Sequence, residues 1–307
     1  MNPPSSVAPE SGPQPPRPAS SRTRPFYWSL RRELWENHSI YLAPLAVAAV
    51  VLIGFGVNVI HSAGGAGTPL ALHLPNDPTP IDQPFAIAAV LLILTGMLTG
   101  AFYCLDALYG ERRDRSILFW KSLPVSDLTT VLSKASIPLV VLPLVVFAII
   151  VATHVAMLLL NAAVLLASGV GLGTLRTHTP LVELWVALLY GVTVLALWQA
   201  PIWGWLLLVS AWARRAVFLW ASLPLIAVCI LEKIAFNTSR FAFFLGYRFA
   251  GGLAHAFGTG RPCCIPHPLT SLTPGNFLSA PGLWTGLVVA AIFLAAAARV
   301  RRYRGPI

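Results

Sequence analysis

Residues 135–168 read ASIPLVVLPLVVFAIIVATHVAMLLLNAAVLLAS, an apolar run without a single Asp, Glu, Lys or Arg. An α-helix needs roughly 20 apolar residues to cross a hydrocarbon core of about 30 Å. The run is therefore long enough for one tilted span or for two short ones. Pro138 and Pro143 near its start would kink a helix in a bilayer without ending it. This stretch predicts that the chain spans a membrane.

The rest of the chain has the same character. Of its 307 residues, 56% are hydrophobic and 10% are charged, and the mean hydropathy is +0.73. A soluble domain could not hide so much apolar surface, because folded proteins keep a largely polar exterior. The apolar blocks predict an all-α polytopic membrane protein with six transmembrane helices, at residues 39–60, 85–106, 135–168, 181–212, 216–231 and 283–298.

The basic residues favour one topology, because cytoplasmic loops carry an excess of Lys and Arg. With six spans and both termini in the cytoplasm, sixteen of the 21 Lys and Arg lie inside and five outside. Dividing 135–168 into two spans would move Arg214 and Arg215 outside, so the single long span is preferred. We expect a multi-pass protein of the plasma (inner) membrane. The five outside residues are Arg176, Lys233, Arg240, Arg248 and Arg261.

The formal net charge of +10 raises the question of nucleic-acid binding. The basic residues cluster where short loops meet anionic headgroups, and no basic stripe lies elsewhere. We therefore expect membrane lipids as partners and no nucleic acid.

The N-terminus divides into two parts. Residues 1–25 are rich in Pro and Ser and predict a disordered cytoplasmic leader, before a single transmembrane domain at 26–307. Residues 26–36, FYWSLRRELWE, place Ser29, Arg32, Glu33 and Glu36 on one arc of a helical wheel and mainly aromatic and Leu side chains on the rest. This pattern predicts an amphipathic helix in the inner interface, with Tyr27, Trp28, Arg32 and Trp35 as its interfacial residues. The alternative is an aromatic-rich extension of the first span.

The segment between spans two and three, 108–134, is the most informative polar stretch. Gly110 indicates a bend, and residues Glu111–Lys121 predict a short cytoplasmic helix that ends before Pro124. Ser126 is a suitable N-cap for the next helix, with Asp127 in its first turn. We expect a helix, a sharp turn and then span three.

The external segment 232–281 also has amphipathic character. On a helical wheel Asn237, Arg240, Arg248 and His255 fall on one side, opposite a side that includes Phe249 and Phe257. We expect one or two interfacial or re-entrant helices, with Arg240, Arg248 and His255 facing water or headgroups and with Phe249 and Phe257 buried. A seventh span, carrying two arginines, is the alternative. The adjacent Cys263 and Cys264 could oxidise or pair with another chain.

Motifs for chemistry are absent from the sequence. It contains no P-loop, no Gly-x-Ser-x-Gly and no His-Glu-x-x-His, so we expect no catalytic residues, no cofactor and no metal. His154 and Asn161 are the candidate pathway residues in span three, although hydrogen bonding between helices explains them equally well. A coupled carrier usually needs carboxylates or broken helices near the midplane. The sequence indicates neither, so we expect the energy for uphill transport to come from a partner.

The segment 109–126, YGERRDRSILFWKSLPVS, resembles a recurrent pattern in the membrane subunits of type-2 ATP-binding-cassette (ABC) transporters. In those permeases an E-R-x-x-x-(S/T) run after span two leads to L-P-(V/I)-S, and a Lys follows at the start of span three, here Lys134. Residues 201–215, PIWGWLLLVSAWARR, also resemble the end of span four in such permeases.

The resemblance implies a permease subunit that forms half of an exporter, with ATP hydrolysis in a separate cytoplasmic ATPase. Two permeases, identical or different, would pair around the pathway, and the segment between spans five and six would re-enter from outside to gate the exit. The N-terminal helix and the loop after span two would contact the ATPase. The residues proposed for that contact are Glu111, Arg112, Arg113, Arg115, Leu118, Phe119 and Lys121.

Two other classes of protein are alternatives to a permease. A membrane-embedded lipid-modifying enzyme would need His, Asp or Glu clustered at one membrane face, and the clusters here are basic. A non-transport scaffold differs from a permease in having no ATPase that depends on it. The substrate is left open by the sequence.

Overall fold

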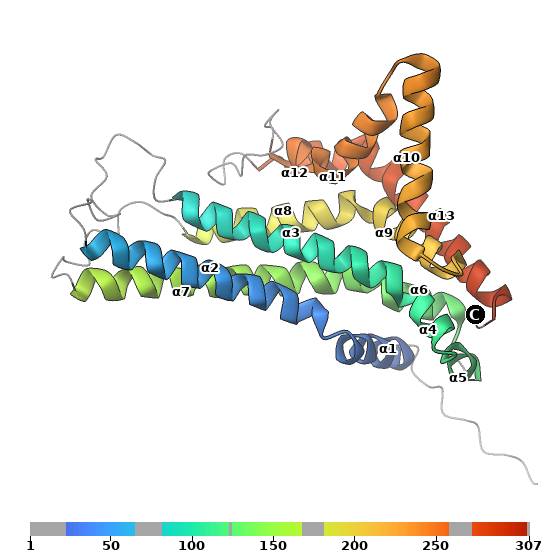
Figure 1. Cartoon of the computed structure of the whole chain (residues 1–307), viewed down its shortest axis with the longest axis horizontal. Helices are drawn as coiled ribbons and strands as arrows, with labels where there is room; N and C mark the ends of the chain where they lie inside the picture. Colours follow the sequence, from blue (N-terminus) through green and yellow to red (C-terminus); the bar gives the residue numbers. More distant parts are fainter. Residues whose placement is uncertain (1–22, 65–81, 123–124, 168–180, 258–271, 306–307) are drawn as a thin grey trace, which may run out of the picture.

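The computed structural model describes residues 23–64, 82–122, 125–167, 181–257 and 272–305, and every regular element in these ranges is helical (Figure 1). Most of the leader, the loop after span one, and Cys263 and Cys264 lie outside the described residues. The first helix begins at Thr23, three residues earlier than predicted. In chain order the helices are α1 (Thr23–Glu36), α2 (Ser39–Gly64), α3 (Asp82–Ala107), α4 (Tyr109–Arg113), α5 (Ile117–Ser122), α6 (Asp127–Ser136), the π-helix η2 (Ile137–Val141), α7 (Leu142–Ala167), α8 (Leu181–Trp198), α9 (Ala200–Trp212), α10 (Val217–Phe236), α11 (Arg240–Phe257), α12 (Pro274–Ser279) and α13 (Pro281–Tyr303).

Several helices are long and apolar enough to cross a membrane, which confirms a multi-pass membrane protein. Five stretches meet this test in the described part of the chain, and the bent pair α8–α9 makes a sixth if it is counted as one span. The helix α11, which was the candidate seventh span, is not among them. The five stretches are Ser39–His61, Pro84–Arg113, Asp127–Val164, Val217–Phe236 and Pro281–Tyr303.

The third span is a single long element, so the alternative of two short spans is wrong. It runs for 38 residues from Asp127 to Val164 through α6, η2 and α7. At 1.5 Å per residue this is about 57 Å, nearly twice the thickness of a hydrocarbon core. Pro138 lies in the π-helical segment and Pro143 in the first turn of α7, and neither ends the helix. The surplus length leaves room for the first turns of α6 outside the hydrocarbon.

The segment predicted as the fourth span is broken, so the expectation that the chain has no broken helix is wrong. The helices α8 and α9 meet at Gln199 with a bend of 48°. Pro201 lies at the start of α9, where a proline has no amide hydrogen to continue the ladder of α8. The break leaves backbone and side-chain groups near Gln199 free to bond to another helix.

The core is formed where α2, α3 and α7 run side by side, with α9 packed against α3 and α8 packed against α7 (Figure 1). Close contact between α3 and α7 depends on Gly96, because a Cβ there would lie 2.6 Å from Val146 Cγ2. Likewise α9 and α13 approach at Gly204, where a Cβ would lie 3.2 Å from the carbonyl oxygen of Ala290. Small residues at such crossings are typical of helix packing in membranes.

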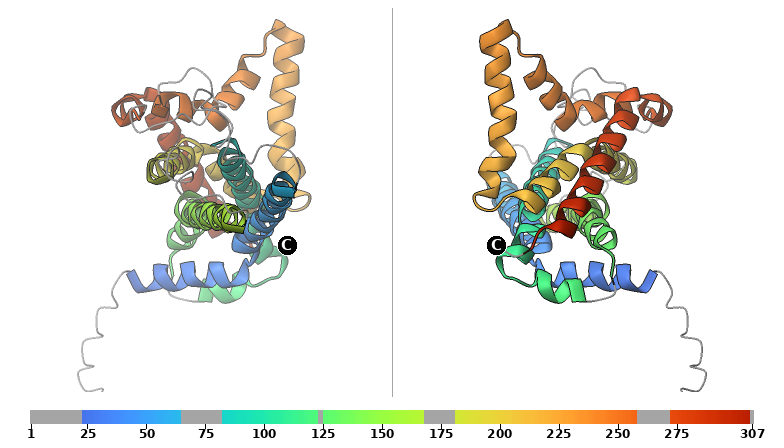
Figure 2. Two further views of the ribbon diagram at one scale, coloured as in Figure 1. Left: turned by 90° about the vertical axis from the view of Figure 1, so that its left-hand side faces the viewer. Right: turned by 90° about the vertical axis from the view of Figure 1, so that its right-hand side faces the viewer.

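The helix α10 stands apart from this bundle (Figures 1 and 2). Its first turns pack against α9 through Val217 and Ala221. Further along, large apolar side chains such as Leu223, Leu231 and Phe236 are exposed. This face requires a cover of lipid or protein.

Candidate functional site: a buried ionic cluster and an exposed loop face

The loop between spans two and three folds into two short helices, where one helix had been predicted from Glu111 to Lys121. Arg115 has a left-handed backbone (φ 58°), and this residue separates α4 from α5. Gly110 lies inside α4 and makes no bend; a Cβ there would come within 3.3 Å of Asp106 Oδ2. The predicted cap is confirmed, because Ser126 Oγ accepts a hydrogen bond from the Thr129 backbone N–H at the start of α6.

A cluster of buried charged side chains joins this loop to three other helices. Lys134 Nζ of α6 lies 2.7 Å from Glu33 Oε1 of α1 and 3.2 Å from Glu111 Oε1 of α4. Arg301 Nη2 of α13 lies 2.8 Å from Glu111 Oε2. We call Glu33, Glu111, Lys134, Arg301 and their neighbour Asp127 the ionic cluster.

Two further contacts complete the ionic cluster. Tyr103 donates a hydrogen bond from its hydroxyl to Glu33 Oε2 (2.9 Å), and Arg301 Nη1 lies 3.3 Å from Asp127 Oδ1. The side chains of Glu111 and Lys134 are 6% and 3% exposed, so the charges are shielded from water. Removing one member of such a buried pair is expensive, because the remaining charge is left without a partner. The cluster therefore holds α1, α4, α6 and α13 in one arrangement.

The neighbouring Arg112 is also buried, and it closes the end of α9. Its Nη1 donates to the backbone carbonyls of Ala211 (2.7 Å) and Ala213 (3.0 Å), which have no partner within their own helix. Ser210 Oγ accepts from the backbone N–H groups of Leu108 and Tyr109 at the start of α4. The end of span four and the loop after span two are thus fastened together.

Glu111 and Arg112 consequently have their partners inside this chain, although both had been predicted to contact an ATPase. The other residues of that prediction, Arg113, Arg115, Leu118, Phe119 and Lys121, are all exposed. Leu118 and Phe119 are 58% and 60% exposed, on a helix anchored by the buried Ile117. We call these five residues the loop face.

The helix α5, which carries most of the loop face, contacts α1 and the end of α13. The Arg32 guanidinium lies 3.4 Å from the centre of the Trp120 ring, and Arg32 also pairs with Glu36. Lys121 Nζ donates to the backbone carbonyl of Arg304 (3.1 Å). Cation–π contacts and bonds of this kind hold α5 against two separate helix ends.

The helix α1 is amphipathic, but its polar side lies against the protein. Glu33 is buried in the ionic cluster, while the rings of Tyr27, Trp28 and Trp35 are exposed. Arg31 lies over the rings of Trp28 and Trp35, at 5.5 Å and 5.8 Å from their centres. Exposed aromatic rings beside a cation are typical of residues at a membrane interface.

His154 is fully buried and contacts two other helices. Its Nδ1 accepts a hydrogen bond from Trp185 Nε1 (3.3 Å), so Nε2 carries the proton and donates to the carbonyl of Phe85 (3.0 Å). This geometry favours the helix-contact interpretation. Asn161 lies two turns further along α7 and is half-buried.

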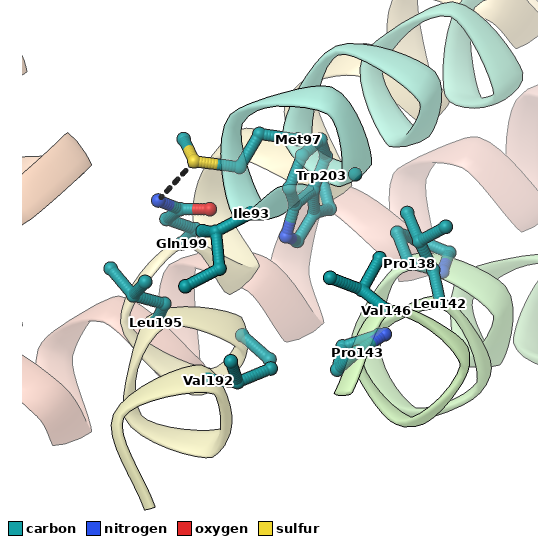
Figure 3. Close-up of a pocket in the computed structure, with 12 residues that line it drawn as sticks. Ile93, Met97, Pro138, Leu142, Pro143, Val146, Val192, Leu195, Gln199 and Trp203 are labelled. Carbon is teal, nitrogen blue, oxygen red and sulfur yellow. Dashed lines mark hydrogen bonds between the residues drawn. The ribbon is translucent and has the colours of Figure 1, made fainter. Parts of the chain in front are cut away.

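A small cavity lies between α3, the η2–α7 junction and the broken span (Figure 3). Its volume is about 40 Å³, and Gln199, Met97, Trp203 and Pro143 are among its lining residues. A cavity of this size holds one or two water molecules and is far smaller than a ligand pocket. It is not large enough to be a pathway.

The broken span is bonded to α11, and here one sequence prediction is wrong. Arg248 is 7% exposed and does not face water: its guanidinium lies 5.2 Å from the centre of the Trp198 ring, and Nη1 donates to the carbonyl of Gly282 (2.9 Å). The predicted burial of Phe257 is confirmed, whereas Phe249 is 43% exposed. The charge of Arg248 can be buried because the Trp198 ring and the Gly282 carbonyl take the place of water around the guanidinium.

Two hydrogen bonds strengthen the contact between the break and α11. Trp198 Nε1 donates to the Tyr247 carbonyl (3.0 Å), and Gln199 Nε2 donates to the Phe249 carbonyl (2.8 Å). A movement of α11 would therefore act directly on the bend in span four.

Three members of the ionic cluster were not predicted to lie together: Glu33, Lys134 and Arg301. Lys134 and Arg301 were counted as cytoplasmic charges, and Glu33 was placed on the polar arc of the N-terminal helix. The signal that could have identified them is their position next to long apolar runs, where an unpaired charge is costly.

Comparison with known proteins gives no relative: no protein-family model, no curated protein and no solved structure matches this chain.

Proposed function

We propose that this chain is the permease subunit of a type-2 ABC transporter, an exporter that forms half of a translocation pathway and is driven by a separate cytoplasmic ATPase. It has six spans, with α8 and α9 counted as one, and both termini in the cytoplasm. The loop face and α1 are the surfaces that meet the ATPase.

The observation that carries the proposal is the loop face together with the ionic cluster beneath it. Leu118 and Phe119 provide an exposed apolar contact, and Arg113, Arg115 and Lys121 provide charge around it. A large aromatic side chain within a polar rim is the usual composition of a strong protein contact. The same segment carries the sequence resemblance to ABC permeases, and it offers a docking surface in a chain that has no nucleotide-binding motif.

The ionic cluster supplies a route for mechanical coupling. A partner can shift the conformation of the permease only as far as its contacts with the two states differ. Force applied to α5 would reach α4, and Glu111 connects α4 to Lys134 of α6 and Arg301 of α13. In the proposed topology, Lys134 and Arg301 lie near the cytoplasmic ends of spans three and six. The loop would therefore move two spans at once.

A second permease completes the pathway. The hollow of about 40 Å³ at the bend between α8 and α9 is too small for a substrate. In the proposed transporter the substrate path lies between two copies or between this chain and a related one. The exposed apolar face of α10 offers a surface that a second subunit could cover. The contacts of α11 with the break at Gln199 would connect an external gate to that path.

The proposal is tested by purifying the tagged chain from its native membranes in mild detergent and measuring ATPase activity in the eluate. Phe119→Ala removes the apolar contact, and truncation of such a residue costs about 2 kcal/mol or more, or roughly a 30-fold loss of affinity. The matched control is Phe102→Ala, which truncates a ring on α3 that is 65% exposed and lies outside both the loop face and α10. Substituting Glu111 is a poorer probe, because it would break the ionic cluster.

We expect ATPase activity to co-purify with the wild type and with Phe102→Ala and to be lost with Phe119→Ala. The absence of any ATPase from the wild-type complex would contradict the proposal. Equal recovery with both variants would remove the loop face from the contact.

A further inference from the structure

A groove of about 580 Å³ opens between the start of α6 and the last turns of α13. Arg299, Arg302 and Tyr303 contribute one wall, and Leu128 and Ala298 contribute apolar surface. Both helices reach the ends of their candidate spans here, at Asp127 and Tyr303. The groove therefore lies where a membrane span meets the headgroup layer.

The two arginines share one side of α13 because they are three residues apart, with Tyr303 four residues after Arg299. Both are exposed, and no carboxylate in the described residues forms an ion pair with either of them. Asp127 also lines the groove, but its carboxylate lies 3.3 Å from Arg301, which points inward to the ionic cluster. Within the described part of the chain, the groove thus keeps two positive charges that no carboxylate neutralises.

The apolar surface continues from the groove along both helices. On α6, Leu128 is 52% exposed, and the exposed Leu132 follows one turn later. On α13, the exposed Ala295 lies one turn before Arg299. A cationic end next to an apolar track matches a phospholipid, whose charged phosphate is attached to acyl chains.

We propose that this groove binds the headgroup of an anionic phospholipid. The lipid phosphate lies between Arg299 and Arg302, and the acyl chains follow Leu128 and Ala298. Guanidinium groups bind phosphate through paired N–H donors, and basic pockets between membrane helices are typical sites for anionic lipids. The site requires that the chain spans a membrane and does not depend on the proposed transport function.

The lipid would also act on the ionic cluster. Arg301 lies between the two phosphate-binding arginines in sequence and pairs with Glu111 on the opposite side of α13. A bound phosphate would hold the last turn of α13 in place and relieve the repulsion between neighbouring guanidiniums. Anionic lipid should therefore stabilise the folded protein.

Native mass spectrometry of the full chain in detergent tests the site, with phosphatidylglycerol, phosphatidylcholine and inorganic phosphate as separate probes. Each arginine near a lipid phosphate contributes about a fivefold change in affinity, so Arg299→Ala/Arg302→Ala should weaken phosphatidylglycerol binding by roughly 30-fold. The matched control, Arg214→Ala/Arg215→Ala, removes two exposed arginines outside the groove and should change the affinity by less than about twofold.

Phosphatidylcholine should bind the wild type more weakly than phosphatidylglycerol, and millimolar phosphate should not displace the lipid. Equal losses in the two double variants would show that only general surface charge attracts lipid, and would overturn the proposal. Displacement of phosphatidylglycerol by millimolar phosphate would identify the groove as a site for a soluble anion and would also overturn it.

Discussion

Lys134→Met removes the central cation of the ionic cluster while keeping a side chain of similar length. The wild-type ammonium lies 2.7 Å from one Glu33 oxygen and 3.2 Å from one Glu111 oxygen. In the variant Arg301 still pairs with Glu111, whereas Glu33 retains only the hydroxyl of Tyr103. One buried carboxylate is then left without a positive partner.

The magnitude follows from the burial of the pair. Breaking a buried ion pair by removing one partner costs about 3–5 kcal/mol. For domains of about 150–250 residues, 1 kcal/mol changes the Tm by about 2–4 °C. We therefore expect Lys134→Met to lower the Tm by on the order of 10 °C.

The assay is thermal unfolding of the purified chain in one detergent, followed by circular dichroism. Lys233→Met is the matched control, because Lys233 is an exposed lysine on α10, and it should change stability by less than about 0.5 kcal/mol. The double variant Glu33→Gln/Lys134→Met removes both charges of the closest pair. It should be more stable than Lys134→Met alone, with a coupling energy of about 2 kcal/mol.

Two results would refute the reasoning. One is a Tm for Lys134→Met equal to that of Lys233→Met, which would mean that the cluster is hydrated. The other is strict additivity of the Glu33→Gln and Lys134→Met effects, which would mean that the two side chains do not interact.

Two further predictions concern topology and packing. In a cysteine-free background, Arg115→Cys and a cysteine in the C-terminal tail should react only with reagents that enter the cytoplasm, while Thr68→Cys should react from outside; labelling of the tail from outside would invalidate the span count. Gly252→Ala should lower the Tm, because a Cβ there would lie 2.7 Å from Cγ of Trp198, whereas Gly246→Ala has open space and should be neutral or stabilising. Equal Tm values for the two glycine variants would show that α11 is not packed closely on α8.

Much of the fold could be predicted because it depends on local sequence. Hydropathy identified the apolar helices, and the Ser126 cap and the effect of Pro138 follow from side-chain chemistry a few residues away. The break at Gln199 was not predicted, because the sequence around Pro201 does not distinguish a proline that separates two helices from one that only kinks a single helix. Only the hydrogen bond from Gln199 to α11, fifty residues later in the chain, shows what the break is used for.

The candidate site was less predictable, since its partners are far apart in sequence. The pairing of Glu33 with Lys134 crosses 101 residues, and that of Glu111 with Arg301 crosses 190. The count of basic residues places Lys134 and Arg301 on the same side of the membrane, in agreement with their shared partner Glu111. Such a count does not distinguish a buried charge from a solvated one. The same difficulty explains Arg248, whose Trp198 partner replaces water.

The most direct test of the central claim is to identify what touches the loop face in the membrane. The photoreactive amino acid p-benzoylphenylalanine would replace Phe119, and Phe236 in a control, since both rings are exposed. After irradiation of whole cells, the crosslinked partner is isolated with the tagged chain and tested for labelling by an azido-ATP analogue. We predict that position 119 captures an ATP-binding protein and that position 236 does not. Crosslinks from position 119 that reach only lipid, or only proteins that bind no ATP, would contradict it.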